Sequence, residues 1–378
     1  MKKMRLKIEK WAHGGYTLVH FEGKPIFVSG GIPGEEVDIT LSKEEKKISF
    51  GIVSDVITPS PLRISSDCSL FGDCGGCSYR HLPYSEELKI KTKLLHELFP
   101  FYNREIQIIS GSSHKYRNNV QWQTDGTSIG FFARDSHILL EVESCPNLPF
   151  ELQPKNVLKK DIQKLQTERI QENRKNPRKL EFRLGKDGKA ILSNEPSSVL
   201  VFGREYKIPE YGFFQINSHL IEPWLTEIKL MLGDAKSILE LFCGVGVIGL
   251  ALDQKFDLYS GYEINKTSIL CAESNKNKTS QNHYRFTAKD LYKDPLPKKD
   301  LKLTTWIVNP PRSGLNELIL KQMEENKPKL VLYSSCNAHT LQRDSKTILK
   351  MGFVLEELKL VDFFPRTQHY EVLAKFSR

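Results

Sequence analysis

The stretch "SILELFCGVGVIGLAL" (residues 237–252) decides the fold, because an apolar strand-forming run meets a glycine turn and then a helix-forming run. Gly244 and Gly246 stand in the turn, where a side chain would keep the backbone away from a ligand. A helix beginning at this turn adds positive potential to it. The stretch predicts a ligand-binding turn in an open α/β sheet.

The same alternation continues toward the C-terminus. From residue 206 onward, strand-like runs are each followed by a helix-like run: "DLYSGYEI" by "SILCAESNKNK", "TTWIVN" by "LNELILKQMEE", and "LVLYSS" by "TLQRDSKTILKMG". A series of this kind predicts an α/β fold with a parallel, doubly wound, Rossmann-like sheet over residues 206–378.

Two carboxylates follow the next strand-like runs. Glu263 ends the second run in "GYEI", where it can accept hydrogen bonds from a ribose, and Asp290 follows the third in "AKDL", beside a possible base edge. A glycine turn followed by acids at these strand ends is the usual layout for S-adenosylmethionine. The alternative is a glycine-rich turn of an unrelated doubly wound fold, and the position of the acids favours the cofactor.

The fourth strand-like run ends in "TTWIVNPPRSGL" (304–315), where two prolines fix the turn that presents Asn309 and Arg312. Asn-Pro-Pro also occurs in amino-directed methyltransferases, but an aromatic residue follows there, and Arg312 follows here. A plain strand-ending proline turn is a further alternative.

Cys336 follows the fifth run, at the same predicted sheet edge as Glu263 and Asn309. Carbon 5 of a pyrimidine is a weak nucleophile, but a thiolate that adds to carbon 6 enables carbon 5 to attack an electrophilic methyl group. A base must then remove the proton from carbon 5. Glu371 is the candidate base, with His369 near it in the chain. A lone cysteine at a strand end is more often inert, so Cys336 needs this context.

A second set of cysteines lies earlier in the chain. "CSLFGDCGGCSYRHL" carries Cys68, Cys74 and Cys77, and Cys145 follows in "VESCPNLP". With no export signal at the N-terminus, clustered thiols indicate a metal site rather than disulfides. Four thiolates suit zinc or an iron–sulfur cluster, and spacing alone does not decide between them.

The N-terminal part reads differently from the rest. Residues 1–58 form short alternating runs separated by Gly and Pro, which predicts a small OB-type β-barrel, and residues 59–205 predict a mixed α+β region. Lys and Arg number 55 against 46 Asp and Glu, a net charge of +9 that suits a nucleic-acid partner. No apolar run approaches the roughly 20 residues of a membrane span. We therefore expect a cytoplasmic protein with no membrane partner, and a monomer by default.

Taken together, these motifs resemble the RNA 5-methyluridine (uracil-5-) methyltransferase family, in the branch that has a TRAM domain and an iron–sulfur cluster. "GGIPGEEV" is similar to the TRAM turn, and the segment that begins at Cys68 is similar to the family's cluster-binding segment. "YGFFQINS" is similar to the element whose Gln contacts the cofactor or the target, and "YSSCN" and "FFPRTQHYEVLAKF" are similar to the catalytic motifs. The resemblance implies a TRAM barrel over 1–58, a central iron–sulfur domain over 59–205 and a methyltransferase domain over 206–378. It also implies RNA as partner, with 23S ribosomal RNA as the expected substrate.

The resemblance implies a role for each candidate residue. Cys336 is the nucleophile and Glu371 the base. Two bound groups are also implied: S-adenosylmethionine would be bound by Gln215, Phe242, Gly244, Glu263, Asp290 and Asn309, and a [4Fe-4S] cluster by Cys68, Cys74, Cys77 and Cys145.

One position departs from the family pattern. The family has Asp-Pro-Pro-Arg where this chain has Asn309 before the two prolines. A carboxylate only accepts hydrogen bonds, whereas an amide also donates, so Asn309 could serve uracil or cytosine. Two other functions therefore stay open: an amino-directed methyltransferase, which would need neither Cys336 nor Glu371, and a catalytically silent RNA-binding factor.

Overall fold

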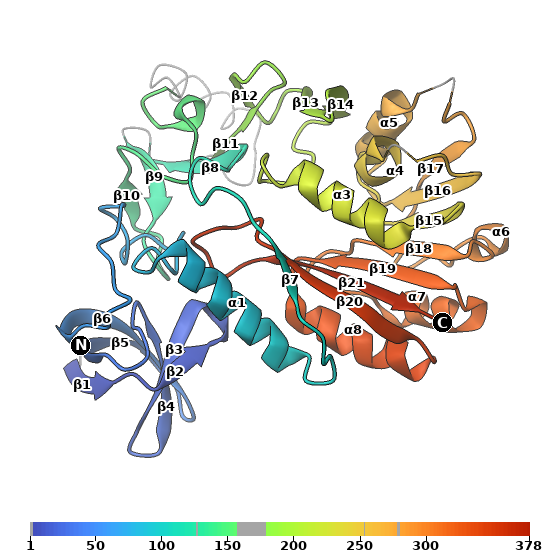
Figure 1. Ribbon diagram of the computed structural model, residues 1–378. Coiled ribbons are helices and arrows are strands. Elements are labelled where there is room, and N and C mark those ends of the chain that lie inside the picture. The colour runs from blue at the N-terminus through green and yellow to red at the C-terminus, as the bar shows by residue number, and fades with distance from the viewer. Residues whose placement is uncertain (1–2, 126–127, 157–178, 253, 278–279) are drawn as a thin grey trace.

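The computed structural model describes residues 3–125, 128–156, 179–252, 254–277 and 280–378. Residues 157–178, within the expected central domain, lie outside the described residues. Figure 1 shows three parts: a small N-terminal sheet, a central region with its own sheet, and a large C-terminal sheet flanked by helices.

The N-terminal sheet curls into a β-rich, TRAM-like half-barrel. Its strands are β1 (Lys3–Lys7), β2 (Lys10–Ala12), β3 (Tyr16–Phe21), β4 (Lys24–Ser29), β5 (Glu36–Glu44) and β6 (Ser49–Thr58), in the order β1-β5-β6-β4-β3-β2. β1 pairs with β5 while β2, next in the chain, pairs with β3, so this segment spans opposite edges of the sheet. Alternate residues such as Val28, Val37 and Ile39 are fully buried inside, as the period of two predicts. The 3-10 turn η1 (His13–Gly15) joins β2 to β3.

The central region combines one long helix with two small sheets. Its elements are α1 (Tyr84–Leu98), β7 (Gln107–Ile109), β8 (Asn119–Thr124), β9 (Ile129–Phe132), β10 (Leu139–Glu141), η2 (Phe150–Leu152), β11 (Lys179–Leu184), β12 (Ala190–Leu192), β13 (Ser197–Val201) and β14 (Arg204–Ile208). One sheet has the order β10-β9-β8-β11-β12, and β13 pairs with β14. Ile90, Leu94 and Leu95 lie on the buried face of α1. Through this apolar face the helix packs between the half-barrel and the large sheet (Figure 1).

The large sheet forms a Rossmann-like α/β core. Its strands are β15 (Ser237–Leu241), β16 (Leu258–Glu263), β17 (Tyr284–Ala288), β18 (Thr305–Val308), β19 (Leu330–Ser335), β20 (Val354–Val361) and β21 (Glu371–Ser377), joined by α3 (Ile221–Leu232), α4 (Val247–Ala251), α5 (Lys266–Asn275), α6 (Lys298–Leu301), α7 (Glu317–Asn326) and α8 (Ala338–Lys350). The order is β17-β16-β15-β18-β19-β21-β20-β7. Both faces are buried: Trp306 and Tyr333 belong to one core, Ile307 and Leu332 to the other.

The expectation of parallel strands throughout was wrong at one end of this sheet. β21 lies between β19 and β20 and is antiparallel to both. A connection without a crossover helix, residues 362–370, joins β20 to β21, so the chain must return in the opposite direction. In Figure 1 this connection projects from the sheet toward α1 and the central region.

The five parallel strands β15 to β19 all end at the same edge of the sheet, which is where open α/β folds bind ligands. Among the described residues, no helix has both the length and the apolar character needed to cross a membrane.

Candidate active site

Cys336 lies directly after β19 and before α8, in a cavity of about 240 Å³. Asn337 caps α8 by accepting a hydrogen bond from the His339 N–H at 3.1 Å, and its amide donates to the Arg312 carbonyl at 3.1 Å. The cap thereby ties the Cys336 turn to the Asn-Pro-Pro-Arg turn. The cavity is lined by His13, Gly14, Tyr79, Lys91, Leu94, Arg312, Cys336, Asn337, Ala338, His339, Gln368, His369 and Tyr370.

Two opposite charges act on the Cys336 thiol. Burial raises the pKa of this thiol above its usual 9.0, and the neighbouring carboxylate of Glu371 raises it further. The Arg312 guanidinium lowers the same pKa through its charge and a hydrogen bond. Arg312 is therefore the group that stabilises a thiolate at this position.

Glu371 is the first residue of β21, and it is only 3% exposed. The neighbouring pair Ser335 and Val372 sets β21 beside β19, and the Ser334 hydroxyl donates to Glu371 Oε1 at 2.7 Å. Burial raises the pKa of Glu371 to about 7, while the Ser334 hydrogen bond lowers it. A carboxylate with this pKa can accept and release a proton near neutral pH, as a general base must.

His369 stands two residues before Glu371 in the chain, and its side chain lines the Cys336 cavity. Burial, together with the positive charges of Arg312 and Lys91, lowers the pKa of His369 to about 4. His369 is therefore neutral at pH 7, so its ring lines the cavity as a polar, uncharged group.

The β15–α4 turn offers an open backbone. Gly244 has φ +55° and Gly246 has φ +77°, a left-handed conformation that favours glycine. A Cβ at Gly244 would meet nothing within 4 Å, so the space in front of it is free for a ligand. The Gly244 N–H donates to Glu263 Oε2 at 3.3 Å, which places the acid at the end of β16 beside the turn. This arrangement fits S-adenosylmethionine.

Phe242 also belongs to this turn, with φ +65° and its ring centroid 5.6 Å from that of Tyr292. Tyr292 in turn donates its N–H to Asp290 Oδ1 at 3.1 Å, so Phe242 and Asp290 flank the same strand ends. Lys293 lies 3.2 Å from Asp290 and forms an ion pair with it.

Asn309 and Gln215 occupy two further positions. Asn309 is half-buried, and its N–H donates to the Leu241 carbonyl at 3.3 Å, next to the glycine turn. Gln215 is buried in the segment before α3, and its carbonyl accepts from Asn118 Nδ2 at 2.7 Å. The central region therefore holds the backbone at Gln215 in place.

The four N-terminal cysteines line one pocket of about 190 Å³ together with Arg80, Arg117 and Asn147. The Gly76 N–H donates to the Cys74 sulfur and Asn147 Nδ2 to the Cys77 sulfur, each at 3.4 Å. Within the described ranges, no three His, Cys, Asp or Glu side chains have the spacing of ligands to a single metal ion. The four thiols share one pocket, and four thiolates are the ligand type that an iron–sulfur cluster would use.

Sequence reasoning missed part of the cavity wall. His13 and Gly14 come from the half-barrel and Lys91 from α1, and the His13 ring lies 4.8 Å from that of His339. No local motif marks these residues, because only the packing of the three parts brings them to Cys336. Ser334 is different, since its place beside Cys336 in "YSSCN" could have indicated a partner for the base.

Comparisons with known proteins agree with this architecture. The family described as tRNA (Uracil-5-)-methyltransferase matches residues 197–375. An RNA methyltransferase of Leptospira interrogans is 36% identical over 100% of this chain and 95% of its own length. An RNA methyltransferase of Aquifex aeolicus is 30% identical, covering 99% of this chain and 98% of its own. The 23S rRNA (uracil(1939)-C(5))-methyltransferase RlmD of Shewanella halifaxensis is 27% identical, covering 99% and 96%.

A solved structure shares the fold over the whole chain. The crystal structure of Pyrococcus abyssi tRNA (uracil-54, C5)-methyltransferase in complex with S-adenosyl-L-homocysteine superposes with a TM-score of 0.76 at 22% identity, covering 99% of both chains. Given the Rossmann-like core, the matching family and relatives of equal length, this chain belongs to the RNA (uracil-5-)-methyltransferase family and is an S-adenosylmethionine-dependent enzyme of that class.

Proposed function

We propose that this enzyme forms 5-methyluridine in 23S ribosomal RNA, with Cys336 as nucleophile and Glu371 as base. The observation that carries the mechanism is the pairing of these two groups: a buried carboxylate acts on a thiol that opens into a cavity at the ligand-binding edge of the sheet. The name of the Shewanella halifaxensis relative supports ribosomal RNA, and the Pyrococcus abyssi protein makes transfer RNA the alternative.

Cys336 and Glu371 supply the nucleophilic and acid–base groups that the proposed reaction needs. The Cys336 thiolate forms a C–S bond to uracil carbon 6, and the electron pair of the 5,6 double bond becomes available at carbon 5. Carbon 5 then carries both a new methyl group and its original proton. Glu371 takes that proton, the 5,6 double bond re-forms, and the C–S bond breaks to return the thiolate.

S-adenosylmethionine, when bound, supplies the electrophilic methyl group. We assign its binding to Gln215, Phe242, Gly244, Glu263, Asp290 and Asn309. The open backbone at Gly244 and the position of Glu263 beside it support this assignment. Asn309 can accept a hydrogen bond from uracil N3–H through its amide oxygen, which keeps uracil as the proposed base.

We further propose that Cys68, Cys74, Cys77 and Cys145 hold a [4Fe-4S] cluster in the central region. Burial raises the pKa of Cys145 to about 11, so this thiol stays protonated at neutral pH unless a metal binds it. The N–H groups that face Cys74 and Cys77 suit sulfur ligands of an anionic cluster. Metal analysis and thiolate-to-iron charge-transfer absorbance of the anaerobically purified protein are the readouts. We expect about four irons per chain, and zinc in place of iron would contradict the proposal.

The mechanism is tested by trapping its covalent intermediate. Glu371→Gln retains the nucleophile but lacks the base, so it should accumulate a protein–RNA adduct that survives a denaturing gel. Cys336→Ala should form no adduct. Fragments of 23S ribosomal RNA and whole transfer RNA run in parallel distinguish the two substrates. An adduct with Cys336→Ala, or none with Glu371→Gln despite bound RNA and cofactor, would contradict the proposed roles.

A further inference from the structure

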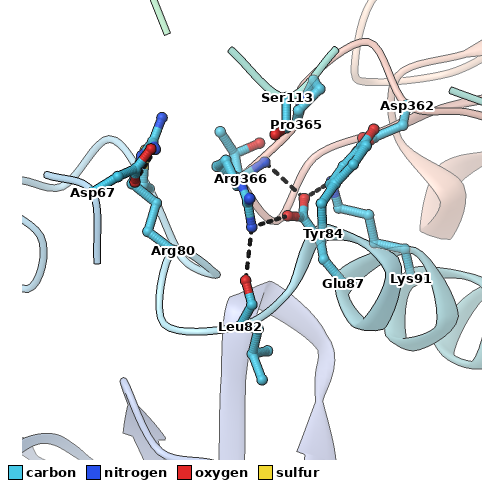
Figure 2. A network of polar contacts seen from close by, with 12 residues as sticks. Asp67, Arg80, Leu82, Tyr84, Glu87, Lys91, Ser113, Asp362, Pro365 and Arg366 are labelled. Atoms are coloured by element: carbon cyan, nitrogen blue, oxygen red, sulfur yellow. Dashed lines mark hydrogen bonds and ion pairs between the residues drawn. The ribbon is translucent and has the colours of Figure 1, made fainter. Parts of the chain in front are cut away.

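A buried charge cluster holds the connection that leads to Glu371. Lys91 of α1 places its Nζ 2.7 Å from Asp362 Oδ1, just after β20, and 2.8 Å from Glu87 Oε1 on its own helix (Figure 2). Tyr84, also on α1, donates its hydroxyl to Asp362 Oδ2 at 2.7 Å. The connection is therefore anchored to α1 at its first residue.

Arg366 provides a second anchor in the middle of the connection. Its N–H donates to Glu87 Oε1 at 2.7 Å, and its guanidinium donates to the Leu82 carbonyl at 2.8 Å (Figure 2). Its carbonyl accepts from the Ser78 N–H at 2.7 Å. Arg366 has φ +68°, a conformation that a non-glycine residue adopts only when its surroundings enforce it.

The cluster contains equal numbers of positive and negative groups, and it is almost completely buried. Two cations, Lys91 and Arg366, face two carboxylates, Glu87 and Asp362, and their exposed fractions are 1%, 7%, 0% and 0%. Breaking a buried pair by removing one partner leaves an uncompensated charge, whereas a fully paired set permits few arrangements. Such a cluster fixes the path of the chain that passes through it.

We propose that Glu87, Lys91, Asp362 and Arg366 are positioning residues that hold the 362–370 connection so that Glu371 reaches carbon 5 of the bound uracil. The inference rests on the proposed role of Glu371 as base. It assigns to α1, a helix outside the methyltransferase sheet, control over the second half of the reaction. Lys91 also lines the Cys336 cavity, so the cluster lies directly behind the site that it organises.

The proposal predicts a particular kinetic signature. Addition of Cys336 does not need the Glu371 proton transfer, so loosening the connection should spare adduct formation. Proton removal and release of the thiolate need it, so these should slow. Deuterium at uracil carbon 5 should slow release further in a loosened variant, because proton removal then limits the rate.

The test uses the full-length enzyme carrying Arg366→Gln with Glu87→Gln, which removes one positive and one negative charge together from side chains that do not line the Cys336 cavity. Rapid-quench single turnovers measure adduct formation and decay separately. We expect formation within about twofold of wild type, decay at least about tenfold slower, and a larger deuterium effect on decay. Lys359→Met with Glu227→Gln is the matched control: this partly buried pair, 2.8 Å apart, ties α3 to β20 and does not touch the connection.

Unchanged decay in the double variant would overturn the proposal. Equal slowing of formation and decay, reproduced by the control, would show a general loss of structure and would overturn it as well. Should the double variant fail to fold, Tyr84→Phe perturbs the same cluster more mildly, and slower decay is again expected. Glu371→Gln run alongside separates the two claims, because a failure to trap adduct there contradicts the proposed base itself.

Discussion

At the scale of single residues, burial sets the protonation of both catalytic candidates. Cys336 and Glu371 each have a raised pKa because each loses water, and the carboxylate and thiol charges repel one another. Arg312 offsets part of this cost for the thiolate, and the Ser334 hydroxyl does so for the carboxylate. Because Cys336 and Glu371 act in different steps of the proposed reaction, the pH dependence of each step reports on a different group.

The decay of the covalent adduct should titrate with Glu371. Only the deprotonated carboxylate accepts the carbon 5 proton, so the decay rate should fall about tenfold per pH unit below the Glu371 pKa of about 7 and level off above it. Ser334→Ala removes a hydrogen bond to the charged form, which raises that pKa and moves the pH limb upward. Adduct formed at one pH and then diluted into a pH series provides the measurement. A limb that stays in place in Ser334→Ala would contradict this assignment.

Restoring the acid at position 309 should strengthen uracil selection. Asn309→Asp replaces a neutral acceptor with a charged one. If Asn309 accepts from the uracil N3–H as proposed, the gain should be about 1 kcal/mol, or roughly fivefold in kcat/KM. The amide donor that could serve cytosine is lost at the same time. Competition between uridine- and cytidine-containing RNAs measures both effects. A lower rate on uridine in Asn309→Asp would show that the amide is needed here.

At the scale of elements, the β15–α4 turn and the end of α3 provide a matched pair of glycines. Gly244 and Gly233 both have φ +55°, and a Cβ at either would meet nothing within 4 Å. Gly244→Ala and Gly233→Ala should therefore each lose roughly 1–3 kcal/mol of stability from backbone strain, with the larger loss at Gly233, whose ψ of −131° lies outside the left-handed helical region.

Only Gly244→Ala should also weaken binding of S-adenosylhomocysteine, because its methyl group enters the space proposed for the cofactor. Titration calorimetry of both variants, with thermal unfolding for stability, distinguishes the two positions. Equal affinity in Gly244→Ala and Gly233→Ala would place the cofactor elsewhere.

At the scale of the whole molecule, the half-barrel closes one side of the Cys336 cavity through His13. His13→Ala removes the ring contact with His339 and part of the cavity wall, so it should raise the KM for RNA roughly two- to tenfold, about 0.4–1.4 kcal/mol of binding free energy. His20→Ala is the control, since His20 belongs to the same half-barrel but pairs with Glu9 at the surface. Binding of S-adenosylhomocysteine should be unchanged in both variants. Equal KM values for RNA in His13→Ala and wild type would remove the half-barrel from the site.

The sequence predicted the parts of the molecule better than their assembly. Strand and helix periods located the half-barrel strands, α1 and the β15–β19 series, because these patterns are local. The antiparallel β21 and the addition of β7 to the large sheet depend on connections and packing, which no window of sequence contains. For the same reason, the residues at the sheet edge could be named in advance, while His13 and Lys91 in the cavity wall could not.

The most direct test of the central claim is nucleoside mass spectrometry of unmodified 23S ribosomal RNA after incubation with S-adenosylmethionine and either wild-type enzyme or Cys336→Ala. The account predicts 5-methyluridine with the wild type and none with Cys336→Ala. A methyl group on an exocyclic amine, or 5-methyluridine formed by Cys336→Ala, would contradict it.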